Sequence, residues 1–166
     1  MEKQKAVIFD IDGVLAKKSP DREHREYDKV DLDLPVDINL KIVNFFGTSY
    51  QADRADKIIF ITGRKELCRD KTAKWLLSNF QKVAKRKSFN TYEYYINAYD
   101  FEHSTLLFMR DDKDRRPSDV LKKEIYENHI KDKYDVVAVF EDDPKNVKMF
   151  RDLGLFVFDV GRENEK

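Results

Sequence analysis

The chain has 166 residues, of which 41% are hydrophobic, and this is enough for one folded domain with a substantial core. Its 32 basic and 32 acidic residues cancel, so overall charge gives no argument for a nucleic-acid or membrane partner, and any anionic ligand must be bound locally. The single cysteine, Cys68, excludes an internal disulfide framework. No apolar run is long enough to span a bilayer, and the N-terminal MEKQK shows no signal region, so we expect a cytoplasmic protein.

Short apolar runs rich in Val, Ile and Phe alternate along the chain with longer amphipathic runs. This order is typical of strands that are covered on both faces by helices. In chain order we expect strand 6–9, helix 36–46, strand 57–62, helix 65–80, strand 105–109, helix 117–130, strand 135–141, helix 144–153 and strand 155–160. The alternation predicts an α/β fold with a doubly wound, mainly parallel Rossmann-like sheet, formed by a single domain over residues 1–166.

Polar residues stand at the carboxyl ends of three predicted strands, namely Asp10 and Asp12, Thr62 to Arg64, and Asp142 with Asp143. Doubly wound sheets bind ligands at these ends, so the side chains converge if the strands are neighbours. Four carboxylates in one crevice repel one another unless a divalent cation neutralises them, and hard oxygen ligands suit Mg²⁺. A cation there would shield an incoming phosphate, which would allow a carboxylate to attack phosphorus and form an aspartyl-phosphate.

The segments FDIDGVL, FITGR and FEDDPKNV, with a lysine in a helix between the last two, together resemble the four motifs of the haloacid dehalogenase-like (HAD) phosphatases. The resemblance implies that Asp10 is the nucleophile and Asp12 the general acid and base. It also implies that Thr62 hydrogen-bonds the phosphoryl group and that the lysine stabilises it. The metal ligands implied in this way are Asp10, Asp12, Asp142 and Asp143.

A closer resemblance lies to the phosphatase half of bacteriophage polynucleotide kinase/3′-phosphatase enzymes, through FDIDGVLAK, TGR and RRPSDVLKKEIYENHI. It implies that Lys122 is the motif lysine and that Arg22 and Arg64 bind substrate. It also implies an acidic residue just before the lysine helix, where either Asp119 or Ser118 would stand. The sequence contains no GxxxxGK[ST] phosphate loop, so we expect no kinase domain in this chain. The chain is then either a free-standing phosphatase, compatible with a viral or phage source, or an excised domain.

The two usual insertion points for a cap, residues 16–36 and 110–116, are too short to hold a separate domain. An uncapped site leaves room for a bulky substrate, so we expect a Mg²⁺-dependent phosphomonoesterase that removes the 3′-phosphate from DNA or RNA ends. A phosphatase of mononucleotides or other small phosphate esters would share every catalytic residue. A catalytically silent phosphate-binding or scaffold module is a third reading, which the intact motif residues oppose.

The segment 82–104 combines a basic cluster with several aromatic residues, which include Tyr92 and Tyr94. Interleaved cations and aromatics can bind a phosphodiester backbone and stack bases. Alternating aromatics also suit a packed strand, and we favour that interpretation of this segment.

Overall fold

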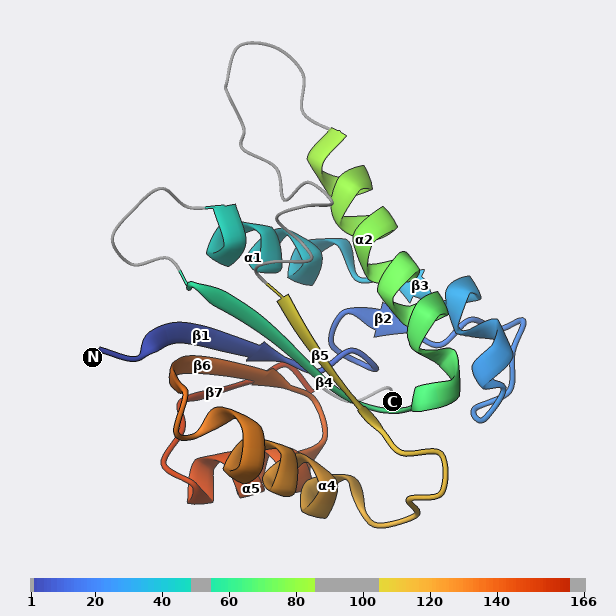
Figure 1. Cartoon of the computed structure of the whole chain (residues 1–166). Coiled ribbons are helices and arrows are strands. Elements are labelled where there is room, and N and C mark those ends of the chain that lie inside the picture. Colours follow the sequence, from blue (N-terminus) through green and yellow to red (C-terminus); the bar gives the residue numbers. More distant parts are fainter. Residues whose placement is uncertain (1, 49–54, 86–104, 162–166) are drawn as a thin grey trace.

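The structure is a computed structural model that describes residues 2–48, 55–85 and 105–161 (Figure 1). Its elements in chain order are β1 (Gln4–Phe9), β2 (Ala16–Lys17), the 3₁₀ helix η1 (Tyr27–Leu32), β3 (Leu34–Pro35), α1 (Asp37–Thr48), β4 (Lys57–Lys65), the 3₁₀ helix η2 (Glu66–Cys68), α2 (Arg69–Lys85), β5 (Thr105–Arg110), α4 (Ser118–Ile125), the π-helix η3 (Tyr126–Ile130), β6 (Tyr134–Glu141), α5 (Pro144–Asp152) and β7 (Val157–Asp159). The predicted alternation of strands and helices is confirmed.

Five parallel strands form one sheet in the order β5-β4-β1-β6-β7. At the centre of this sheet, Phe9 of β1 lies opposite Phe60 of β4 and Phe140 of β6. The chain first builds outward from β1 to β5 and then returns to the other side of β1 with β6. This reversal of direction beside β1 is the place where doubly wound sheets bind ligands, beyond the carboxyl ends of their strands.

Helices cover both faces of the sheet, α1 and α2 on one and α4 and α5 on the other (Figure 1). Successive strand residues point to opposite faces, so both faces need apolar residues. In β1, Phe9 belongs to the core that includes Leu76 of α2, and Ile8 belongs to the core that includes Phe150 of α5. Each such fully buried side chain stabilises the fold by roughly 1.5–3 kcal/mol, and together they fix the carboxyl end of β1 between two layers.

Several boundaries differ from those expected. Strand β4 continues past its predicted end at residue 62 to Lys65, so Gly63 and Arg64 also lie on the strand rather than in a loop. The predicted helix 117–130 is α-helical only to Ile125 and ends in the wider turns of η3. Of the segment 82–104, residues 86–104 lie outside the described residues, so the interpretation of that segment stays a prediction.

The segment between β1 and α1 forms a small flap, in which Ala16–Lys17 and Leu34–Pro35 pair as an antiparallel ladder around η1. Here and in the short link between β5 and α4, the described residues contain no separate cap domain. Within the described ranges, none of the helices has both the length and the apolar character needed to cross a bilayer.

Candidate active site

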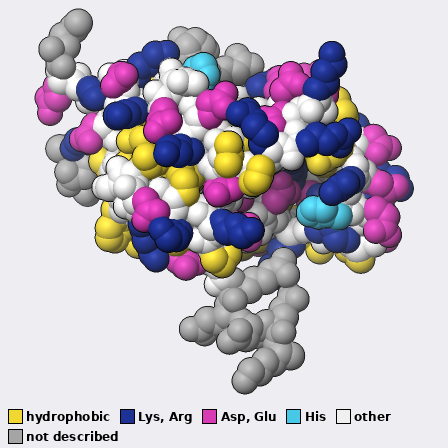
Figure 2. Space-filling model, turned by 90° about the horizontal axis from the view of Figure 1, so that it is seen from below, with side chains coloured by type: hydrophobic (Ala, Val, Ile, Leu, Met, Phe, Trp, Pro, Cys, Tyr) yellow, Lys and Arg dark blue, Asp and Glu magenta, His cyan; other side chains and the backbone are white. Residues whose placement is uncertain are grey.

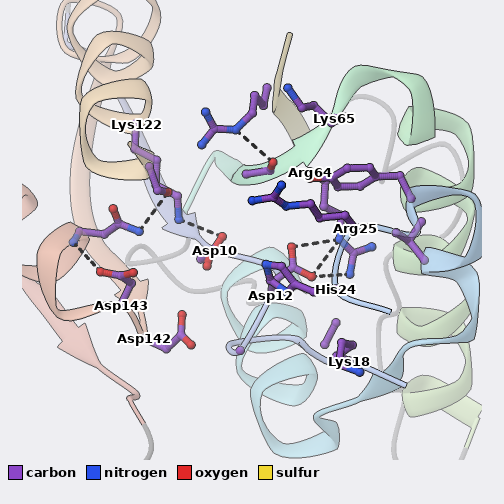
Figure 3. A pocket seen from close by; sticks show the side chains of 18 of the residues that line it. Asp10, Asp12, Lys18, His24, Arg25, Arg64, Lys65, Lys122, Asp142 and Asp143 are labelled. Atoms are coloured by element: carbon purple, nitrogen blue, oxygen red, sulfur yellow. Dashed lines mark hydrogen bonds and ion pairs between the residues drawn. The ribbon is translucent and has the colours of Figure 1, made fainter. Parts of the chain in front are cut away.

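A pocket of about 720 Å³ opens at the carboxyl ends of β1, β4 and β6. Figure 3 shows Lys122, Asp142 and Asp143 on one of its sides, and Asp12, Arg64 and other basic side chains on the opposite side. The pocket therefore has two walls of different composition, and Asp10 lines it from the end of the central strand.

A tight turn after β1 requires the glycine of the DxDG motif. Gly13 has φ +88°, in the left-handed region that favours glycine. A Cβ atom at this position would come within 1.8 Å of Oδ2 of Asp142. The glycine therefore allows Asp142 to approach the turn that carries Asp10 and Asp12.

The first wall, called here the acidic wall, is formed by the carboxylate cluster of Asp10, Glu141 and Asp142, of which Asp10 and Asp142 line the pocket and Glu141 is buried next to them. Asp10 follows β1 and Glu141 ends the neighbouring strand β6, so the strand register brings their carboxylates together. Lys122 reaches both from the first turns of α4, with its Nζ 2.9 Å from Oδ1 of Asp10 and 2.7 Å from Oε2 of Glu141. Asp10, Glu141 and Lys122 are all buried. Lys122, predicted to stabilise the phosphoryl group, thus lies beside the predicted nucleophile.

Burial and like charge shape the acidic wall. Burial raises the pKa of Asp10 well above its usual value, and Lys122 opposes this effect without cancelling it. Burial, with Glu141 beside it, raises the pKa of Asp142 to about 6. Burial alone would lower the pKa of Lys122, but Asp10 and Glu141 outweigh it and raise that pKa to about 12. One lysine thus compensates three carboxylates only in part.

The acidic wall fits a hard divalent cation. One oxygen from each of Asp10, Glu141 and Asp142 lies within 4.8 Å of the other two. Carboxylate oxygens are the ligands that Mg²⁺ prefers, and a cation would relieve the repulsion between these carboxylates. Mg²⁺ is therefore compatible with the residues present.

The predicted ligand set of Asp10, Asp12, Asp142 and Asp143 stays a prediction. The carboxylate cluster found among the described residues includes Glu141 and neither Asp12 nor Asp143. Asp143 is exposed and caps α5, with its Oδ1 accepting from the backbone N–H groups of Lys145 at 2.8 Å and Asn146 at 3.4 Å. The carboxylate of Asp12 lies outside the three-carboxylate cluster, because it is bound to the opposite wall.

The second wall, called here the paired wall, is a chain of alternating charges made by Asp12, Arg64, Asp33 and Arg22. Arg64 donates from Nε and Nη2 to the Asp12 carboxylate at 2.8–3.1 Å, and its Nη2 also donates to Oδ2 of Asp33 at 2.8 Å. Burial acts to raise the pKa of Asp12, but Arg64 outweighs it and lowers that pKa. Arg64, predicted to bind substrate, is therefore already hydrogen-bonded to Asp12, the predicted general acid and base.

Asp33 joins the two arginines and was not predicted from the sequence. Its carboxylate is buried and accepts from Nε and Nη2 of Arg22, each at 2.6 Å, besides Arg64 and the backbone N–H of Ser19 at 2.9 Å. Arg22 also donates from Nη1 to the carbonyls of Glu23 and His24. Arg22, predicted to bind substrate, thus lines the pocket, but its guanidinium is buried and bound to the protein.

The structure also places Thr62 and the two residues considered just before the motif lysine. Thr62 is fully buried and donates its hydroxyl to Oδ2 of Asp12 at 3.1 Å, so in this structure it binds the acid and base. Of the two residues before the lysine, Ser118 lines the pocket and accepts from Nδ2 of Asn146 at 3.3 Å, whereas Asp119 is not among the lining residues. The geometry therefore favours Ser118 over Asp119 at that position.

Comparison with known proteins identifies the family of the chain. The model of a family described as "Polynucleotide kinase PNKP phosphatase domain" matches residues 4–164. The chain is 31% identical over 162 residues to a protein of Autographa californica nuclear polyhedrosis virus described as a candidate bifunctional polynucleotide kinase/RNA ligase, covering 96% of this chain and 20% of that protein. The chain thus spans about a fifth of this curated relative.

Two solved structures resemble the fold. One is the Pnkp1/Rnl/Hen1 RNA repair complex, in which a chain matches with a TM-score of 0.69 and 26% identity, covering 96% of this chain and 43% of that one. The other, a Pnkp1/Rnl/Hen1 complex, has a chain that matches with a TM-score of 0.70 and 25% identity, covering 98% and 47%. In both cases this chain corresponds to less than half of the larger one.

Proposed function

Because the chain belongs to the family of polynucleotide kinase PNKP phosphatase domains, within the HAD-like phosphatases, we propose that it removes the 3′-phosphate from polynucleotide ends. The observation that carries the proposal is the position of Asp10. Its carboxylate lies at the end of the central strand, faces the pocket and is held by Lys122, while Asp12 is held on the opposite wall by Arg64. A phosphoryl group between the walls would meet a nucleophile and a proton donor.

In the first step, an oxygen of Asp10 forms a bond to phosphorus and the bond from phosphorus to the 3′-oxygen breaks. The leaving oxygen keeps the electron pair and takes a proton from Asp12. Arg64 favours the ionised form of Asp12 in the free protein, but the negative charge of a bound phosphate favours the protonated form. The products of this step are a 3′-hydroxyl end and phosphate bound covalently to Asp10.

In the second step, Asp12 is a carboxylate and takes a proton from a water molecule, whose oxygen attacks phosphorus. The bond between phosphorus and Asp10 breaks, and the electron pair returns to the Asp10 carboxylate. Lys122 stabilises negative charge beside Asp10 in both steps, because its Nζ is 2.9 Å from the attacking carboxylate. Inorganic phosphate leaves, and both aspartates regain their starting forms.

Asp10, Glu141 and Asp142 are the residues that would hold Mg²⁺. When bound, the cation supplies positive charge that lowers the repulsion between these carboxylates and a phosphate dianion. Lys122 cannot supply enough positive charge alone, because its ammonium group already pairs with two carboxylates.

The open pocket supports a polynucleotide over a small ester, because the described residues around it include no cap domain. The matched relatives carry names of polynucleotide kinase, RNA ligase and RNA repair. RNA ends are therefore the first substrates to test, with DNA ends beside them.

The experiment is a measurement of phosphate release in Mg²⁺ from matched oligonucleotides that carry a 3′-phosphate, a 5′-phosphate or neither, beside the 3′- and 5′-mononucleotides. We expect release from the 3′-phosphorylated oligonucleotide and little from the 5′-phosphorylated one. Faster release from mononucleotides than from any oligonucleotide would replace this proposal by a small-ester phosphatase. Release from none of them would favour a silent phosphate-binding module.

A further inference from the structure

The buried cationic side chains of the pocket already form ion pairs with carboxylates of the protein. Arg22 and Arg64 share the carboxylate of Asp33, and Lys122 bridges Asp10 and Glu141. Breaking such buried contacts to grip a distant part of a substrate would leave a charge unpaired away from water, which is costly. These residues therefore suit the reacting phosphate or the positioning of the aspartates, and a longer substrate needs other contacts.

Most lysines and arginines at the mouth of the pocket are also bound to other groups of the protein. Lys65 donates its Nζ to the carbonyls of Asp111 and Asp112 at 3.1 and 2.9 Å, and so fixes the link between β5 and α4. In the same link Arg110 donates to the carbonyl of Arg116 at 2.6 Å. Arg116 and Lys18 also bind groups of the protein. The link that borders the pocket is thus held in place by its own hydrogen bonds.

Arg25 and Arg115 differ from all the other lysines and arginines that line the pocket. Both are exposed, and neither guanidinium has a hydrogen bond or ion pair among the residues that the structure describes. Arg25 comes from the flap between β2 and η1, and Arg115 from the link that Lys65 holds. They border one opening from two separate segments.

The surroundings of these arginines indicate which ligand they suit. Figure 2 shows Lys and Arg side chains around a hollow in which acidic side chains are visible, and Figure 3 shows Arg25 on the same side of the pocket as Arg64, opposite Lys122. A guanidinium offers planar paired donors that match a phosphate and stays charged at any physiological pH. The acidic centre of the pocket disfavours a second anion there, so an anion next to the reacting phosphate would bind at the rim.

We propose that Arg25 and Arg115 bind the phosphodiester that precedes the terminal 3′-phosphate, and so select a strand over a mononucleotide. This inference rests on the proposed function and extends it to the part of the substrate that does not react. A mononucleotide has no such phosphodiester, so the two arginines act only on oligonucleotides. They are specificity residues and take no part in the bond changes at phosphorus.

The test compares kcat/KM for a 3′-phosphorylated oligonucleotide with kcat/KM for the nucleoside 3′-phosphate that ends it. The variants are Arg25→Ala, Arg115→Ala and the double variant. Lys123→Ala is the matched control, because it removes one exposed positive charge from α4 at a residue that does not line the pocket. Each pocket variant should lower the oligonucleotide-to-mononucleotide ratio roughly threefold to tenfold, and the double variant should lower it further. Unchanged mononucleotide turnover would establish that these variants fold.

Salt dependence gives a second readout. Each lost contact with a strand phosphate should reduce the slope of log(kcat/KM) against log[salt] for the oligonucleotide by about 0.7. A ratio and a slope equal to those of Lys123→Ala, or equal losses on both substrates, would overturn the inference. In that case the wild-type protein would still release phosphate from the oligonucleotide, whereas failure of the proposed function itself would appear as no such release from the wild type.

Discussion

The two walls of the pocket carry aspartates of opposite character. The acidic wall places the carboxylates of Asp10, Glu141 and Asp142 around one lysine, and burial together with the neighbouring negative charge raises the pKa of Asp10 and Asp142. The paired wall alternates two aspartates with two arginines, and its charges cancel. From this difference we expect the paired wall to keep its geometry without a ligand and the acidic wall to require a cation for its full function.

The largest effect is expected from a change that removes charge from the acidic wall and keeps its shape. Asp10→Asn cannot form the bond to phosphorus, so turnover should fall by several orders of magnitude on every substrate. Phosphate release from an oligonucleotide 3′-phosphate and from an aryl phosphate measures this. Activity near that of the wild type in Asp10→Asn would refute covalent catalysis by this residue.

The corresponding change in the paired wall should depend on the substrate. Asp12→Asn removes the proton donor, which matters most for the poorly leaving 3′-oxygen, so we expect a loss of about 10²–10⁴-fold on the oligonucleotide. An aryl leaving group needs no proton, and its first step should suffer less. Single-turnover rates on the two substrates separate these effects, and identical losses would argue against the acid role of Asp12.

Comparing these walls with the sequence shows where prediction succeeds. The strands of the sheet could be predicted because they are buried on both faces and read as continuous apolar runs, as in the segment 6–9. The carboxyl end of β4 was placed three residues early, because the Thr-Gly-Arg sequence is also typical of a turn. Asp10 and Asp12 were found through a local motif that fixes their spacing.

The remaining site residues depend on contacts that short-range patterns describe poorly. The segment Glu141 to Asp143 contains three adjacent acidic residues. Which two of them face Asp10 depends on the residue at which β6 ends. The signal was present, because Pro144 occupies the first turn of α5 and makes Asp143 its capping residue. No comparable signal exists for Asp33, whose contact with Arg64 spans 31 residues of sequence.

A third prediction breaks the paired wall at its centre. Asp33→Asn leaves two buried arginines without their shared countercharge, and removing one partner of a buried ion pair costs about 3–5 kcal/mol in the free energy of unfolding. Asp31→Asn is the matched control in the same segment, since the ion pair of Asp31 with Lys71 is solvent-exposed. It should cost well under about 1 kcal/mol. Urea denaturation compares the two, and equal losses would mean that the paired wall contributes nothing beyond a surface ion pair.

A smaller effect concerns the acidic wall and pH. The pKa of Asp142 is raised to about 6 in the folded protein, against about 3.9 for an ordinary aspartate. A carboxyl with a raised pKa disfavours the folded state once it ionises, so the contribution of Asp142 to wild-type stability falls as pH rises from about 4 through about 6.

Asp142→Asn cannot ionise and reports this effect directly. In chelator the variant should melt like the wild type below about pH 4 and at a higher temperature above about pH 6. With Mg²⁺ present the order should reverse, because the variant lacks an oxygen ligand that the wild type keeps. A melting-temperature difference in chelator that is independent of pH would contradict the proposed environment of Asp142.

The most direct test of the difference between the walls is calorimetric titration of Mg²⁺ into the wild type and into the Glu141→Gln and Asp143→Asn variants, which change adjacent acids. The account predicts one cation site in the wild type, affinity lowered at least about tenfold in Glu141→Gln, and wild-type affinity in Asp143→Asn, where only a helix cap changes. Loss of binding in Asp143→Asn with full binding in Glu141→Gln would contradict it.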